Sequence, residues 1–329
     1  MKAIVYQKYG SPDVLKLKDI EKPIPSDDEV LVKVHAAAAN PLDWHFMRGA
    51  PFLVRLSGGF FKPKNPKLGA DIAGRVEAVG RNIEQFKPGD EVFGLSKGSV
   101  GGFAEYVCAR ERSLAPKPSN ISFEEAAAAP VAAFTALQGL RDTGRIQAGQ
   151  KVLINGASGG VGTFAVQIAK SYGAVVTGVC STRNLDMVRS IGADHVIDYT
   201  QEDFTRNGKC YDLIFDTVAN RSVLDYKRAL NHGGICSIVG FSTMFHMLKE
   251  MLLGSLVSRF GSRKIDGMGM AKPNQKDLVI IKELLESGKV KSVIDRRYPL
   301  SEVPEAIRYL ETGRARGKVV ITVAQSNRT

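Results

Sequence analysis

Cysteine is scarce in this sequence of 329 residues, and its four copies lie far apart. They are Cys108, Cys180, Cys210 and Cys236, and no two of them form a C-x-x-C pair. Closely spaced cysteines are the usual sign of a disulfide-stapled domain or a structural zinc site. We therefore expect reduced, mostly buried thiols, with neither a disulfide framework nor a structural zinc.

Long hydrophobic runs are also missing. No stretch approaches the roughly 18 consecutive apolar residues of a membrane-spanning helix. The first ten residues, MKAIVYQKYG, lack the charged, apolar and small-residue segments of a signal peptide. We expect a soluble, cytoplasmic protein.

Acidic residues are outnumbered, with 34 Asp and Glu against 45 Lys and Arg, a net charge of +11. This excess suits an anionic ligand, but net charge reports on solubility and nonspecific binding more than on function. We expect neither nucleic acid nor a membrane surface as the main partner. The length and the 44% hydrophobic content are enough for two domains.

The chain divides into three parts by pattern. Residues 1–120 contain short β patterns such as "EVLVKVHAAAA" and "GDEVFGL", with Gly and Pro between them. Strand and helix patterns alternate over residues 121–270, which predicts right-handed βαβ units in a parallel sheet. Residues 271–329 hold a helix and then β pattern again, so we expect them to rejoin the first domain. The prediction is an α/β protein of two domains, 1–120 with 271–329, and 121–270.

A glycine-rich turn joins the first strand of the alternating region to its first helix, in "KVLINGASGGVGTFAVQIAK", residues 151–170. Glycines there let a ligand approach the backbone and leave the N–H groups of the helix start open to a pyrophosphate. The pattern is GxxGGxG rather than GxGxxG, and such turns also occur for structural reasons. Its place at the opening of a βαβ series favours dinucleotide binding.

The end of the second predicted strand bears on which dinucleotide binds. An NAD site usually carries an Asp or Glu there, whereas a 2′-phosphate requires cationic and hydroxyl donors. The stretch "GVCSTRN" offers Ser181, Thr182 and Arg183 and no carboxylate. We therefore expect NADPH in preference to NADH; the alternative is that Arg183 is a solvated loop residue.

Motifs along nearly the whole chain resemble those of one family. "GADIAGRVEAVG", "FKPGDEVFGL", "NGASGGVGTFAVQIAKSYGA", "GADHVIDY" and "GKVVI" occur in this order. They are similar to those of the medium-chain dehydrogenase/reductase superfamily, and within it of the zinc-independent quinone oxidoreductase branch. The resemblance implies a GroES-like, β-rich catalytic domain and a Rossmann domain, a doubly wound parallel sheet that binds the nucleotide. It also implies an active site in the cleft between them and a homodimer joined through the nucleotide domains.

The turn, the strand end and the resemblance together supply the expected cofactor contacts. The resemblance implies that Tyr199 helps to hold the 2′-phosphate, and that Thr135, Thr217, Val218, Phe241 and Lys318 lie near the cofactor. The full set of expected cofactor-binding residues is Thr135, Asn155, Gly156, Ala157, Ser158, Gly159, Gly160, Val161, Gly162, Ser181, Thr182, Arg183, Tyr199, Thr217, Val218, Phe241 and Lys318.

The zinc ligands of the family's alcohol dehydrogenases are replaced in this sequence. Asn40 in "NPLD" stands where those enzymes have a Cys, and Ala70-Asp71 stands for their His-Glu pair. A catalytic zinc needs three protein ligands, so we expect no metal. Without a Lewis acid, alcohol oxidation loses a major stabilising contribution. Hydride transfer to a quinone or to the C=C bond of an α,β-unsaturated carbonyl remains accessible.

Candidate catalytic residues lie in "AANPLDWHFMRG". The amide of Asn40 could donate to a developing oxyanion, and Asp43 is either structural or an orienting group. His45 takes a position where several relatives have Tyr, so it is either a proton donor or a packing residue. Trp44 belongs either to the core or to the pocket wall.

Two apolar stretches leave alternatives open. Residues 50–69 could form a lid over an apolar substrate or pack in the core. Residues 241–264, with Met244, Met247 and Met251, could contact substrate, the core or a dimer partner. Two other functions also stay open: an NADPH-binding regulatory or RNA-binding protein with little turnover, and a zinc alcohol dehydrogenase.

Overall fold

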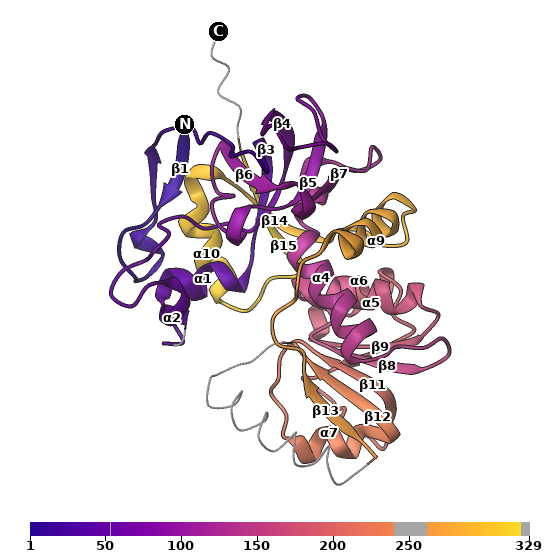
Figure 1. The fold of residues 1–329 in the computed structure, drawn as a ribbon. Coiled ribbons are helices and arrows are strands. Elements are labelled where there is room, and N and C mark those ends of the chain that lie inside the picture. The colour runs from indigo at the N-terminus through magenta and orange to yellow at the C-terminus, as the bar shows by residue number, and fades with distance from the viewer. Residues whose placement is uncertain (53, 240–261, 324–329) are drawn as a thin grey trace. The chain divides into compact units, whose positions relative to one another are not determined.

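A computed structural model describes residues 1–52, 54–239 and 262–323, and its contacts divide the chain into two compact units (Figure 1). The first unit comprises Met1–Val131, Pro273–Gly288 and Ser292–Thr329. The second comprises Ala132–Lys272 and Lys289–Lys291. The sequence pattern placed the first boundary at 120, whereas residues 121–131 group with the first unit because helix α3 (Phe123–Ala127) packs on its sheet.

The first unit is built on a seven-stranded sheet of order β14-β15-β3-β4-β5-β7, with β6 paired to β3. β15 from the end of the chain pairs antiparallel with β3 and parallel with β14. A separate two-stranded sheet joins β1 and β2. The strands are β1 (Lys2–Val5), β2 (Lys16–Asp19), β3 (Glu29–Ala39), β4 (Asp71–Val79), β5 (Glu91–Leu95), β6 (Tyr106–Arg110), β7 (Leu114–Pro116), β14 (Ile294–Pro299) and β15 (Lys318–Thr322).

Helices of the first unit begin and end at recognisable residues. Asn40 precedes α1, Pro41 is its first residue, and Gly49 ends it with φ of 59°. Asn274 caps α9 by accepting from the N–H of Asp277. The remaining bounds are α1 (Pro41–Arg48), α2 (Val54–Gly58), α9 (Gln275–Glu286), α10 (Val303–Glu311), and the 3₁₀ turns η1 (Pro12–Val14), η2 (Lys97–Ser99), η3 (Glu111–Ser113) and η6 (Leu300–Glu302).

The second unit contains a six-stranded, wholly parallel sheet of order β10-β9-β8-β11-β12-β13. Successive strands run outward in one direction from β8 and in the other from β11. Ligands of such sheets bind where the order reverses, at the carboxyl ends of the strands. The strands are β8 (Lys151–Asn155), β9 (Val175–Cys180), β10 (His195–Asp198), β11 (Tyr211–Asp216), β12 (Leu230–Ile238) and β13 (Lys264–Gly267).

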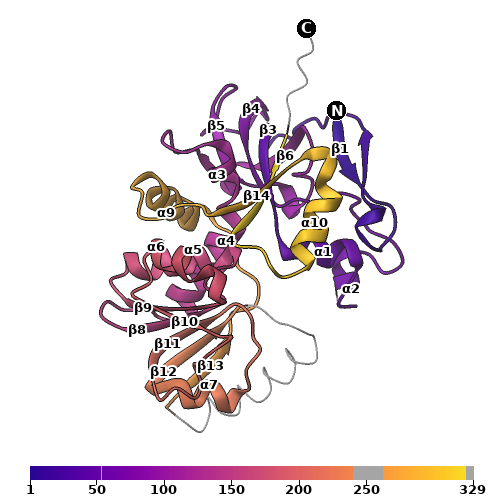
Figure 2. The same cartoon turned by 180° about the vertical axis from the view of Figure 1, so that it is seen from behind.

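Helices cover both faces of this sheet, which explains the continuous apolar runs of its strands. α5 and α6 lie on one face and α7 on the other (Figures 1 and 2). The sequence patterns predicted β8 to β12 and α5 to α7. They did not predict the short turns η4 and η5 or β13, whose short polar sequence KIDG carries no strand signal. The bounds are α4 (Pro130–Gln138), η4 (Gly139–Thr143), α5 (Gly160–Ser171), η5 (Thr182–Asn184), α6 (Leu185–Ser190) and α7 (Val223–Ala229).

The described part of the chain holds no helix with the length and apolar character to cross a membrane. Phe241 and the methionine-containing stretch 241–264 lie almost wholly outside the described residues, so the alternatives for that stretch stay open.

Candidate active site

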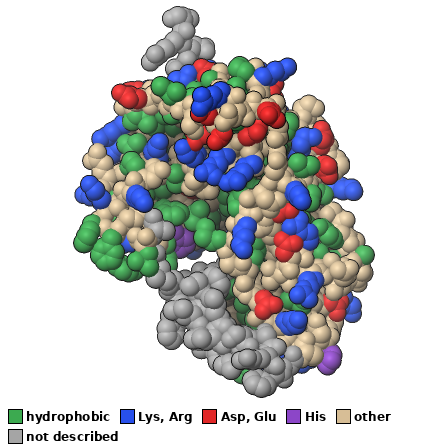
Figure 3. Space-filling view, viewed as in Figure 1, with side chains coloured by type: hydrophobic (Ala, Val, Ile, Leu, Met, Phe, Trp, Pro, Cys, Tyr) green, Lys and Arg blue, Asp and Glu red, His purple; other side chains and the backbone are tan. Residues whose placement is uncertain are grey.

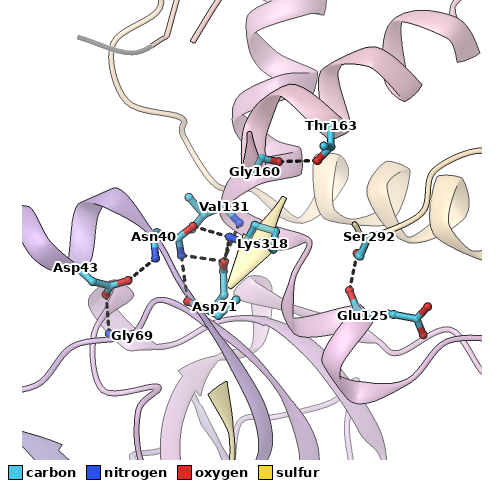
Figure 4. A network of polar contacts seen from close by, with 11 residues as sticks. Asn40, Asp43, Gly69, Asp71, Glu125, Val131, Gly160, Thr163, Ser292 and Lys318 are labelled. Carbon is cyan, nitrogen blue, oxygen red and sulfur yellow. Dashed lines mark hydrogen bonds and ion pairs between the residues drawn. The ribbon is translucent and has the colours of Figure 1, made fainter. Parts of the chain in front are cut away.

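A buried polar network joins β15, β4 and the junction between β3 and α1 in the first unit (Figure 4). Lys318, at the start of β15, donates from Nζ to Asn40 Oδ1 at 2.6 Å and to Asp71 Oδ2 at 3.1 Å. Asn40 Nδ2 donates to Asp71 Oδ2 at 2.9 Å and to the carbonyl of Ala38 at 3.2 Å. The remaining oxygen of Asp71 accepts from the N–H of Val131 at 2.8 Å. The three side chains thus form a closed triangle.

The orientation of the Asn40 amide is fixed by its neighbours. Lys318 can only donate and the Asp71 carboxylate can only accept, so the amide oxygen must face Lys318 and its nitrogen must face Asp71. Both amide hydrogens therefore have acceptors inside the protein. We expected this amide to donate to an oxyanion; in the structure its hydrogens are engaged with Ala38 and Asp71.

The ion pair between Lys318 and Asp71 is deeply buried, with side-chain exposures of 3% and 0%. Sequence reasoning treated Asp71 only as a replaced zinc ligand and did not expect it to be part of the site. A signal was present in "GADIAG", because a carboxylate beside a buried apolar strand requires a cation or several donors. The Asp71 carboxylate holds the positively charged Lys318 ammonium in a fixed position.

Asp43 lies beside this network and fixes the start of α1. Its carboxylate accepts from the N–H groups of Asn40 and Gly69, both at 2.8 Å. Burial raises the pKa of Asp43 to about 7, against the two backbone hydrogen bonds, which lower it. Of the two roles expected for Asp43, these contacts favour the structural one.

We expect Asp43 to make stability depend on pH. Its pKa is raised above the ordinary 3.8, so between about 4 and 7 the folded chain holds a proton that the unfolded chain has lost. The part of the unfolding free energy that depends on protonated Asp43 is fully present below pH 3.8 and is lost as the pH rises through about 7. Urea unfolding of Asp43→Asn should show a slope of unfolding free energy against pH that differs from wild type by about 1.4 kcal/mol per pH unit between these values. Equal slopes for wild type and Asp43→Asn would contradict the raised pKa of Asp43.

His45 and Trp44 pack against each other on α1. Their rings stack with centroids 3.7 Å apart, and Trp44 also packs on the hydrophobic core. His45 Nδ1 lies 2.7 Å from the carbonyl oxygen of Ala50, so this nitrogen must carry the hydrogen and donate it. Burial lowers the pKa of the imidazole below its usual value. His45 is thus held as a neutral ring, with Nε2 as an acceptor, which favours the packing role over proton donation.

The apolar loop after α1 is largely exposed. Phe52, Leu56, Phe60 and Phe61 are 56%, 67%, 49% and 90% exposed. Phe60 makes edge-to-face contacts with Phe52 and Phe61. Core packing therefore does not account for these four side chains, although Leu68 of the same stretch is in the core. The role of the four exposed side chains in a lid stays a prediction.

The glycine turn of the second unit has the geometry of a phosphate-binding turn. Gly156 has φ of 81°, and a Cβ on Gly162 would lie 2.0 Å from the carbonyl oxygen of Gly156. A Cβ on Gly159 would meet only that oxygen, at 3.4 Å, so it would project into open space. Gly159 caps α5 without a side chain, and the N–H groups that open the helix have no acceptor within it. A pyrophosphate fits this arrangement.

Asn184 connects the glycine turn to the end of β9 and was not predicted from the sequence. Its amide nitrogen donates to Ser158 Oγ at 3.0 Å and to Ser181 Oγ at 3.2 Å. Its carboxamide oxygen is buried and has no hydrogen-bond partner among the described residues. An unsatisfied acceptor between two hydroxyls fits a ribose hydroxyl of a bound dinucleotide.

A carboxylate lies closer to the expected phosphate position than the sequence indicated. Thr182 Oγ1 donates to Asp198 and lies 3.2 Å from Thr200 Oγ1. The hydrogen bond from Thr182, followed by those from Thr200, holds the pKa of Asp198 below its usual value. The stretch "STRN" itself has no carboxylate, but pairing of β10 with β9 places Asp198 opposite Cys180. The hydroxyl hydrogen of Thr182 is therefore engaged with Asp198.

The carboxyl ends of β8 and β11 are connected by hydrogen bonds. Thr217 Oγ1 donates to the carbonyl of Asn155 at 2.9 Å, and Asn155 Nδ2 donates to Asp216 at 2.9 Å. Asp216 also accepts from the N–H of Val218 and the hydroxyl of Tyr226. These bonds hold the predicted residues Asn155, Thr217 and Val218 together at the point where the strand order reverses.

The other expected cofactor residues are more dispersed. Thr135 is half-buried on α4, Arg183 is exposed on η5, and Tyr199 is 57% exposed after β10. Lys318 belongs to the first unit, whereas the rest of the described set belongs to the second. Within the described ranges, no three His, Cys, Asp or Glu side chains are grouped so that they could hold a metal ion.

Two family models match the chain. One is described as the alcohol dehydrogenase GroES-like domain and matches residues 26–119. The other is described as zinc-binding dehydrogenase and matches residues 191–321.

Individual proteins match over almost the full chain. The 2-methylene-furan-3-one reductase of Solanum lycopersicum is 39% identical over 98% of this chain and 79% of its own length. The chloroplastic NADPH-dependent alkenal/one oxidoreductase of Arabidopsis thaliana is 37% identical over the same shares. Among solved structures, the quinone oxidoreductase from Coxiella burnetii has a TM-score of 0.84 and 32% identity, covering 98% of this chain and 99% of that one.

Proposed function

Because the chain belongs to the medium-chain dehydrogenase/reductase superfamily, we propose that it is an NADPH-dependent, zinc-independent oxidoreductase. It transfers hydride to quinones or to the C=C bond of α,β-unsaturated carbonyls. The observation that carries the proposal is the buried network of Asn40, Asp71 and Lys318, which offers a fixed cation where the family's alcohol dehydrogenases have metal ligands. The names of the relatives, an alkenal/one oxidoreductase, a furanone reductase and a quinone oxidoreductase, support the same class of acceptor.

The choice of NADPH rests on the end of β9. Ser181 and Arg183 supply a hydroxyl and a fixed positive charge, and Tyr199 is exposed just beyond β10. Asp198 opposes this preference, since its negative charge would repel a 2′-phosphate, so the balance depends on Arg183. One relative is named for NADPH, which supports the assignment.

The chain's own residues bind, orient and shield the reactants. When bound, NADPH supplies the hydride. The N–H groups at the start of α5 would bind the pyrophosphate, and Asn155 and Thr217 shape the turn beside it. The network in the first unit stabilises negative charge on the acceptor, in surroundings from which water is excluded. A preorganised charge of this kind needs no metal.

The alternative functions have less support. An RNA-binding role would favour a continuous basic surface, whereas Figure 3 shows Lys and Arg interspersed with Asp and Glu on the visible face. A zinc alcohol dehydrogenase would need a ligand set, and the described residues contain no such group. The homodimer is a proposal that rests on the family resemblance, and the cytoplasmic location stays a prediction.

The function is tested by NADPH oxidation with metal-stripped protein and two acceptors, an alkyl enone and an ortho-quinone. The hydride is traced with NADPH deuterated at C4. Deuterium on the β-carbon of the enone is the result expected of a double-bond reductase, and turnover of the quinone alone that of a quinone reductase. Turnover of neither acceptor would overturn the proposal in favour of a cofactor-binding protein, and activity that requires added zinc would overturn its zinc independence.

A further inference from the structure

The ammonium group of Lys318 has one hydrogen without an acceptor among the described residues. A lysine ammonium carries three hydrogens, of which one goes to Asn40 Oδ1 and one to Asp71 Oδ2. No acceptor for the third is found among the described residues. The side chain is 3% exposed, so its hydrogens are held in a fixed direction rather than averaged by solvent.

The other candidate donors of the first unit are engaged. Asn40 gives both amide hydrogens to Ala38 and Asp71. His45 gives its Nδ1 hydrogen to Ala50, and its other ring nitrogen is an acceptor. Asp43 acts as an acceptor for two backbone N–H groups. Of the network and α1 side chains considered for the chemistry, only Lys318 combines positive charge with an uncommitted hydrogen.

We propose that Lys318 is a catalytic residue that donates its third N–H to the acceptor oxygen on which negative charge develops, and that Asn40 and Asp71 are positioning residues for it. This assignment rests on the proposed function. It replaces the oxyanion role expected of Asn40 and the cofactor-binding role expected of Lys318. Lys318 lies 278 residues from Asn40 in the chain, so the donor is assembled only in the folded protein.

The step balances without a further reactant. With NADPH bound, breaking of its C4–H bond would deliver hydride to the β-carbon of the enone. The C=C π electrons would then form a double bond between the α-carbon and the carbonyl carbon, and the C=O π electrons would move to the oxygen. That oxygen accepts the hydrogen bond from Lys318, which stays an ammonium throughout. A proton from water then adds to the α-carbon, so one hydride and one proton are consumed for each C=C bond reduced. A quinone takes the hydride in the same way and leaves a hydroquinone anion.

Asp71 explains why the lysine stays in place. Its carboxylate neutralises the buried ammonium, and its second oxygen is held by the N–H of Val131. Removing Lys318 alone would leave a buried carboxylate without its cation, and the protein could fail to fold for that reason. The informative variant therefore removes both charges, as Lys318→Met with Asp71→Asn.

The double variant is compared with wild type, with Asp71→Asn alone, and with Lys18→Met, which alters an exposed lysine of β2. Thermal unfolding is used to check that each variant folds. We expect kcat for the enone to fall about 100- to 1000-fold in the double variant, as for loss of an oxyanion donor, with NADPH affinity within about threefold of wild type. Asp71→Asn keeps the donor but loosens it, so a smaller fall is expected, and Lys18→Met should match wild type.

A binding measurement tests the same residue without turnover. In the presence of NADP⁺, 4-nitrophenol serves as an analogue of the anionic product, and its visible absorbance reports whether it binds as the phenolate. Wild type should favour the phenolate, and the double variant should bind it at least about 10-fold more weakly while binding neutral 4-nitroanisole equally well.

Three results would overturn the assignment. One is unchanged kcat in a folded double variant, another is equal phenolate affinity, and the third is loss of NADPH affinity with kcat preserved, which would make Lys318 a cofactor contact. Failure of the proposed function looks different, because wild type would then reduce no acceptor, and the phenolate measurement would still decide the role of Lys318.

Discussion

Gly162→Ala is expected to weaken NADPH binding by about 100-fold or more, which corresponds to about 2.7 kcal/mol. A Cβ at this position would lie 2.0 Å from the carbonyl oxygen of Gly156 and 2.9 Å from Cα of Ala157. Both are backbone atoms, so the conflict is relieved only by opening the turn and moving the start of α5. Cofactor fluorescence titration measures the affinity, and thermal unfolding should show a lower Tm as well. Unchanged affinity would contradict the assignment of this turn to the pyrophosphate.

Gly159→Ala is the matched control in the same turn. Its Cβ would meet only the carbonyl oxygen of Gly156, at 3.4 Å, and the backbone is extended with φ of −81°. The folded chain should tolerate this methyl group, so Tm should stay close to that of wild type. The methyl group projects toward the space assigned to the phosphates, so NADPH binding should weaken nonetheless. An effect on Tm without an effect on binding would show that the turn is structural only.

Arg183→Ala is expected to raise KM for NADPH roughly 10- to 100-fold and to leave KM for NADH nearly unchanged. A charge-assisted hydrogen bond to a phosphate contributes about 1.5–3 kcal/mol, and NADH has no 2′-phosphate to receive it. Steady-state kinetics with the two cofactors and one acceptor measure the split. Equal effects on both cofactors would remove Arg183 from the phosphate site.

Asp198→Asn should act in the opposite direction. Its carboxylate accepts from Thr182 next to Arg183 in the chain, so neutralising it removes a charge that repels a 2′-phosphate. The ratio of NADPH to NADH efficiency should therefore rise. Arg206→Ala removes an exposed arginine elsewhere on the second unit, so it is the control for the loss of one positive charge in Arg183→Ala. If the ratio does not rise in Asp198→Asn and does not fall in Arg183→Ala, the residues at this strand end do not explain the preference for NADPH.

The nucleotide unit could be predicted in detail because its signals are local. β8, β9 and β11 are short, mostly apolar runs, and the glycine turn follows β8 directly in the chain. The parallel arrangement follows from the connections, since each helix returns the chain to the same end of the sheet. β13 was missed because four residues with the sequence KIDG carry no such pattern.

Only the tertiary structure decided which polar groups meet. Pairing of β10 with β9 brings Asp198 to Thr182, so one expected donor is engaged. The turn η5 after β9 places Asn184 between Ser158 and Ser181, with its amide oxygen left open. Pairing of β15 with β3 brings Lys318 to Asn40 and Asp71. The sequence by itself determined the α/β class, the position of the turn and the replacement of the family's zinc ligands, because these depend on neighbouring residues and motif order. Whether a side chain has a hydrogen left to donate depends on all of its hydrogen-bond partners. For a buried charged group these partners are brought together only in the folded chain.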